Sequence, residues 1–177
     1  MDLVDKVWVY LGFYRLYILK KIITSLTFLV FASAYSQWEF RVNQEISTIE
    51  ALGLIQFKDD RLVNSNLVVD KSRRMGLNIS IQSSFIKENQ KYYVLFELGE
   101  QKIKAKHSIV KNGSLRMEEF KNLIDNEVYE LGDFLKILKA ASQCTLTLRS
   151  SKKVIQGEID LTGSTNAINF VLRGQYP

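Results

Sequence analysis

The sequence predicts a mainly β fold: an antiparallel β-sandwich with one or two packed α-helices, preceded by an N-terminal signal-like hydrophobic helix. Several runs alternate between apolar and polar residues. This period of two places one face of a strand on a core and the other in water. A later stretch has helical periodicity instead, and an uncharged apolar run lies near the start. We expect six to eight strands, with the helices packed on the sheets.

The alternating runs define the expected strands, at residues 77–82, 92–98, 103–109, 144–148 and 155–161. Leu98–Gln101 and Asn112-Gly113 are turn signals, and Ser151–Lys153 links two further strands. The charged stretch 58–74 predicts a loop with one short strand at 67–69.

Two helices are expected near the carboxyl end. From Glu130 to Ser142, apolar residues recur at helical spacing, which predicts an amphipathic helix that buries Leu135 and Leu138. From Gly163 to Gly174 we expect a shorter helix, with Ser164 or Thr165 as its cap and Gly174 as its stop.

Residues 1–36 have the three parts of a secretory signal peptide. Lys20 and Lys21 precede the uncharged run 22–34, and the small residues Ala34 and Ser36 stand before Gln37. The alternatives are an uncleaved N-terminal anchor over residues 10–34, or a buried core helix. We therefore expect a single β-rich domain over 37–177, in the periplasm or secreted; the anchor alternative places the chain at the inner membrane.

Charge and cysteine usage narrow the function classes. The chain carries a formal net charge of +5, and without the four basic and two acidic residues of 1–36 it carries +3. Nucleic acid usually draws a more concentrated basic stripe, so we expect no nucleic-acid partner. Cys144 is the only cysteine, so an intramolecular disulfide cannot form.

No catalytic constellation, metal site or cofactor motif stands out. The one histidine, His107, falls in an alternating run, where we expect a half-buried sheet residue. Glu158 and Asp160 share one strand face, which we expect to be solvated rather than to form an acid–base pair.

Three lysines form the one candidate ligand surface. Lys102, Lys104 and Lys106 recur at period two and so share one strand face. They can form a cationic strip for an anionic polymer or a lipid headgroup. The interpretation we favour is an exposed edge strand that lysines protect from edge-to-edge aggregation.

The carboxyl-terminal third resembles the invasion-associated protein B type of exported bacterial β-sandwich domain. The segments that carry the resemblance are Leu138–Ala141, Ile159–Gly163 and Asn166–Ile168. The chain departs from that family in lacking a cysteine pair. The resemblance implies an extracytoplasmic, non-enzymatic accessory or binding domain, and it transfers no site residue.

Together these features predict an exported, non-catalytic binding or accessory domain of the bacterial envelope. The partners we expect are an envelope protein or an anionic polymer. An envelope-polymer hydrolase and a membrane-anchored interaction protein are the alternatives.

Export predicts a cleavage that can be observed. After expression with export in a Gram-negative host, mass spectrometry of the periplasmic fraction should find a protein that begins at Tyr35 or Gln37. An intact Met1 terminus in the soluble cytoplasmic fraction would contradict this prediction.

Overall fold

The computed structural model describes residues 38–43, 47–58 and 64–174. The expected signal segment, its candidate cleavage residues Ala34, Ser36 and Gln37, and the side chain of His107 therefore lie outside the described residues.

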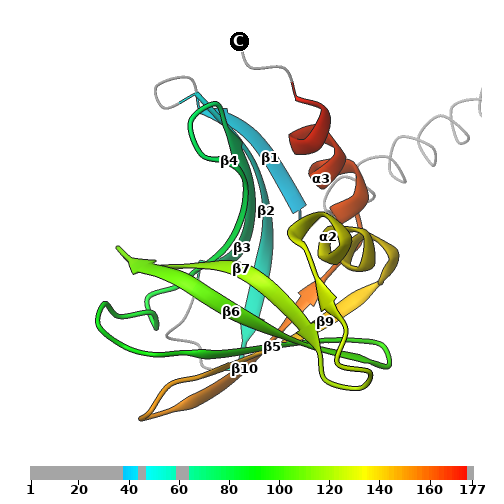
Figure 1. Ribbon diagram of the computed structural model, residues 1–177. Coiled ribbons are helices and arrows are strands. Elements are labelled where there is room, and N and C mark those ends of the chain that lie inside the picture. The colour runs from blue at the N-terminus through cyan, green and yellow to red at the C-terminus, as the bar shows by residue number, and fades with distance from the viewer. Residues whose placement is uncertain (1–37, 44–46, 59–63, 175–177) are drawn as a thin grey trace, which may run out of the picture. The chain divides into compact units, whose positions relative to one another are not determined.

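Ten strands and two helices make up the described chain (Figure 1). The strands are β1 (Trp38–Asn43), β2 (Thr48–Phe57), β3 (Ser65–Ser72), β4 (Gly76–Gln82), β5 (Tyr93–Leu98), β6 (Gln101–Lys111), β7 (Ser114–Asn122), β8 (Val128–Tyr129), β9 (Gln143–Arg149) and β10 (Val154–Asp160). The helices are α2 (Leu131–Ala140) and α3 (Ser164–Arg173). The mainly β composition and the two helices confirm the prediction, whereas the expected six to eight strands were too few.

The predicted sandwich is wrong, because the strands close into an eight-stranded antiparallel barrel. Around the barrel the order is β2-β10-β9-β5-β6-β7-β4-β3, and the pairing of β3 with β2 closes the circle. β1 and β8 are additional strands, paired with β2 and β7. Alternation along a strand says which face is buried, but it does not say whether the first and last strands of a sheet pair with each other.

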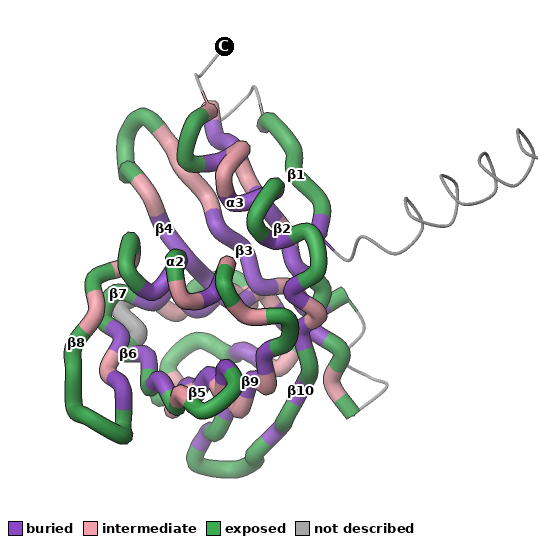
Figure 2. Tube along the Cα trace, turned by 90° about the vertical axis from the view of Figure 1, so that its right-hand side faces the viewer, coloured by how far each residue is buried: buried purple, intermediate pink, exposed green. Residues whose placement is uncertain are grey.

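Side chains fill the interior of the barrel. Along the strands, buried and exposed residues alternate (Figure 2). α2 contributes Phe134, whose ring stacks on Phe120 with centroids 4.0 Å apart and planes 5° apart. Leu135 and Leu138 are also buried, as the helical periodicity predicts. This part of the barrel is a packed core that includes one face of α2.

α3 packs on β1, β2 and β3 and contacts α2 (Figure 1). Its N-cap is Gly163, with φ 87°, and not Ser164 or Thr165 as predicted. The Thr165 hydroxyl instead donates to the Lys139 carbonyl at 3.1 Å, which ties the start of α3 to the end of α2. Gly174 follows the helix as its C-cap, as expected.

Of the stretch 58–74, the described residues 64–74 are more regular than predicted. β3 extends over eight residues rather than three, because β2 and β4 pair with it on both edges. Its charged residue Asp70 lies on the outer face of the sheet and accepts a hydrogen bond from Asn78 Nδ2 at 3.1 Å. Pairing with strands elsewhere in the chain thus overrides a local composition that suggests a loop.

Two glycines offer a matched test of the packing. A Cβ on Gly53 would meet the Trp38 ring at 2.5 Å, whereas one on Gly132 would meet nothing within 4 Å. Gly53→Ala should therefore destabilise the protein by about 1–3 kcal/mol. Gly132→Ala, in a helix, should stabilise it by up to about 1 kcal/mol. Urea unfolding midpoints measure both changes. Equal stability of Gly53→Ala and the wild type would show that the Trp38 contact is dispensable.

Candidate anion-binding face

The three predicted lysines lie on the outer face of β6. Ile103 and Ala105, which alternate with them, are buried. β6 is not an edge strand, because it pairs with β5 on one side and with β7 on the other. The edge-protection interpretation is therefore wrong, because β6 has no unpaired backbone edge that its lysines could protect from another chain.

The lysines of β6 differ in their neighbours. Lys102 Nζ lies 3.4 Å from a Glu97 carboxylate oxygen, and Lys106 Nζ lies 3.8 Å from Glu119. Lys104 Nζ lies instead 5.2 Å from the centre of the Tyr93 ring, a cation–π distance. Tyr93 is half-buried and Tyr92 is buried, which confirms that these adjacent tyrosines face opposite ways.

Two further lysines complete a cationic depression of about 500 Å³ beside β6. Its lining comprises Lys91, Tyr92, Lys104, Ala105, Lys106, Glu119 and Lys121. We call Lys91, Lys104, Lys106 and Lys121 the lysine face. Lys102 lies outside this lining. Sequence reasoning missed Lys91 and Lys121, because their proximity depends on strand register.

The register sets two like charges against each other. Lys104 of β6 is directly opposite Lys121 of β7. Like charges at directly opposed positions of an antiparallel pair are destabilising. Four ammonium groups surround the depression and only one carboxylate, that of Glu119, lines it. An anion bound there would relieve this repulsion.

The residues that could serve catalysis are not brought together. β9 and β5 lie between β10, which carries Glu158 and Asp160, and β6, which carries His107. Glu158 is exposed, as predicted for a solvated face, and Asp160 is half-buried. The β6–β7 register shifts on both sides of His107. The strand is therefore irregular at this residue and does not keep the regular alternation that the sequence predicts.

Cys144 is buried inside the barrel wall. Burial raises the pKa of its thiol to about 12, against a weaker lowering effect from a hydrogen bond with the Glu97 backbone. A thiol in that state supplies almost no thiolate near neutral pH, so it is a core residue rather than a nucleophile.

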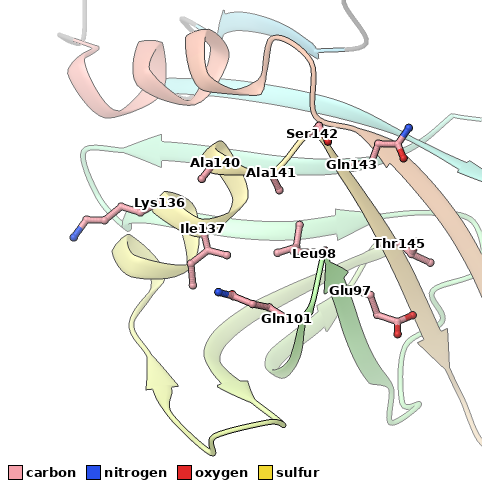
Figure 3. Close-up of a pocket in the computed structure, with 11 residues that line it drawn as sticks. Glu97, Leu98, Gln101, Lys136, Ile137, Ala140, Ala141, Ser142, Gln143 and Thr145 are labelled. Carbon is pink, nitrogen blue, oxygen red and sulfur yellow. The ribbon is translucent and has the colours of Figure 1, made fainter.

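A larger depression, of about 930 Å³, lies between the end of α2 and the β5–β6 hairpin (Figure 3). Its polar residues include Glu97, Gln101, Gln143 and Thr145. Within the described part of the chain, no three His, Cys, Asp or Glu side chains gather as a metal site would require.

Comparison with known proteins gives no match: no family, no curated protein and no solved structure matches the chain. The resemblance to the invasion-associated protein B type therefore stays a prediction. Among residues 38–43, 47–58 and 64–174, no helix is long and apolar enough to cross a membrane.

The state of Cys144 can be tested by thiol labelling. With a pKa of about 12, only about one thiol in ten thousand is ionised at about pH 8. Folded protein should react with a disulfide reagent far more slowly than protein in guanidinium chloride, which serves as the control. Equally fast labelling of the two would contradict the buried placement.

Proposed function

We propose that this chain is an exported, non-catalytic binding domain of the bacterial envelope, and that its lysine face binds an anionic polymer. The observation that carries the proposal is the opposition of Lys104 and Lys121 across β6 and β7, beside Lys91 and Lys106. This arrangement concentrates positive charge that a single carboxylate, that of Glu119, only partly balances, and a polyanion would offset the repulsion.

An aromatic residue supports a ligand with extended anionic groups. Tyr93 holds the Lys104 ammonium over its ring. This contact limits the freedom of Lys104, so less side-chain entropy is lost when an anion binds. Export rests on the signal pattern of residues 1–36.

A binding role fits the acidic residues better than hydrolysis does. Glu158 and Asp160 face outward from β10, and hydrogen bonds from Thr162, from its side chain and then its backbone, lower the pKa of Asp160. A glycosidase needs one carboxylic acid whose pKa is raised so that it can donate a proton. The pKa of Asp160 is lowered rather than raised, so this carboxyl group does not meet that requirement.

The proposal is tested with a heparin octasaccharide as the anionic probe. Lys104→Gln with Lys121→Gln should weaken binding roughly 30-fold, because each lysine near an anionic surface contributes about 1 kcal/mol. Binding should also weaken as salt is added. Isothermal titration calorimetry at two salt concentrations measures both effects.

The matched control is Lys58→Gln with Lys152→Gln. Both lysines are exposed and lie outside the lysine face. The control loses two positive charges, so its net charge equals that of Lys104→Gln with Lys121→Gln. It should bind heparin nearly as well as the wild type. Equal losses in the two double variants would mean that only overall charge matters, and the lysine face would then not be the site.

A further inference from the structure

A second surface has the opposite polarity. The depression at the end of α2 adjoins a smaller one of about 280 Å³ on the outer face of β9 and β10, because Gln143 and Thr145 line both. We call the two together the acidic groove. None of the residues of the lysine face lines it.

One wall of the acidic groove is apolar. It is formed by Ile137 and Ala140 of α2, by Ala141 directly after the helix, and by Leu98 of the β5–β6 hairpin. Figure 3 shows Ile137 and Gln101 extending toward each other from the helix and the hairpin, while Lys136 points away. The Lys136 ammonium is paired with Asp133 at 2.8 Å. This wall therefore offers aliphatic surface rather than a free positive charge.

The other wall carries carboxylates. Glu97, Thr145 and Glu158 are directly opposed across β5, β9 and β10, so they form one row on the outer face. Asp160 is opposite Gln143, and hydrogen bonds from Thr162 keep it ionised by lowering its pKa. The ion pair between half-buried Glu97 and exposed Lys102 is 3.4 Å long, so it is a weak competitor for a bound cation.

Gln101, which lines the groove, has an unused hydrogen-bond acceptor. The side-chain oxygen of Gln101 is buried and has no hydrogen-bond partner among the described residues. A buried polar atom without a partner costs free energy that a ligand donor would recover. The end of α2, whose carbonyls carry partial negative charge, borders the same space. All of these groups favour a ligand that is cationic and rich in donors.

We propose that the acidic groove binds a basic peptide segment of a partner protein, in which lysine or arginine alternates with aliphatic residues. In an extended peptide, alternate side chains point to opposite sides. The aliphatic side chains then contact the apolar wall, and the basic side chains reach Glu97, Glu158 and Asp160. The Gln101 side chain turns its buried oxygen toward the groove and accepts a hydrogen bond from a peptide N–H or an ammonium group.

A fluorescein-labelled peptide, acetyl-Leu-Lys-Leu-Lys-Leu-amide, is the probe, and the same peptide with Glu in place of Lys is its control. Fluorescence anisotropy should show saturable binding of the lysine peptide that weakens with salt, and at least about tenfold weaker binding of the glutamate peptide. Equal affinity for the two peptides, or no saturable binding of the lysine peptide, would overturn the proposal.

Ala140 allows a test at one position with both signs of charge. This residue is exposed, lines the groove and ends α2, so the helix tolerates a long side chain there. Ala140→Lys should weaken binding of the lysine peptide about three- to tenfold, and Ala140→Glu should strengthen it. Equal weakening by the two variants would overturn the assignment of a basic ligand.

A second variant removes the groove's own charge. Glu158→Gln with Asp160→Asn should weaken binding of the lysine peptide and reduce its salt dependence. The control, Glu39→Gln with Glu118→Gln, changes two exposed carboxylates outside the groove and should have little effect. Lys104→Gln with Lys121→Gln should not weaken peptide binding, because it removes positive charge from the neighbourhood of Glu97. The peptide proposal can therefore fail without the heparin proposal failing. Equal losses of peptide affinity in all three double variants would overturn the acidic groove as the peptide site.

Discussion

Strand β2 has two edges but three partners, and the closure of the barrel depends on how one edge is shared. β3 pairs along one edge, whereas the other pairs with β1 over Thr48–Gly53 and with β10 at Gln56 and Phe57. Trp38 stands at this junction. Its ring lies so close to Gly53 that no Cβ fits between them, and its indole N–H donates to the Asp160 carbonyl at 2.8 Å. Because β10 pairs with so little of β2, this contact joins β1 to β10 where the ladder between strands is shortest.

Closure determines where ligands can bind. The inward positions of the strands, together with Phe134 of α2, fill the described interior, and no charged residue among those whose burial is described is fully buried. The antiparallel register then sets Lys102, Glu97, Thr145 and Glu158 in one row across β6, β5, β9 and β10. The lysine face lies on one side of the Lys102–Glu97 ion pair and the acidic groove on the other. Two surfaces of opposite charge are thus a consequence of register in a single sheet.

The sequence predicts features that depend on neighbours in the chain, and it misses those that depend on distant ones. Alternation and turn residues locate β4, β5, β6, β9 and β10, and helical spacing locates α2. Closure rests instead on the pairing of β2 with β3 and, at Gln56 and Phe57, with the distant β10, which no local pattern contains. The hydrogen bond between Trp38 and Asp160, 122 positions apart, supports the same junction. For the same reason, sequence reasoning found only part of the lysine face. Lys104 and Lys106 share a strand, but Lys121 joins them only through the β6–β7 register, and that pairing also removes the edge that the lysines were expected to protect.

The small net charge of the chain is a poor guide to what it attracts. Residues 37–177 carry a formal net charge of +3, yet four lysines gather on one face while Glu97, Glu158 and Asp160 line another. At physiological salt the field of an exposed charge decays over about 8 Å. A ligand near either face therefore experiences mainly the charges of that face and little of the protein's total. The two surfaces come closest where Glu97 lies diagonally across the β5–β6 register from Lys104, so a polyanion and a basic peptide bound at the two proposed sites would influence each other mainly at that end.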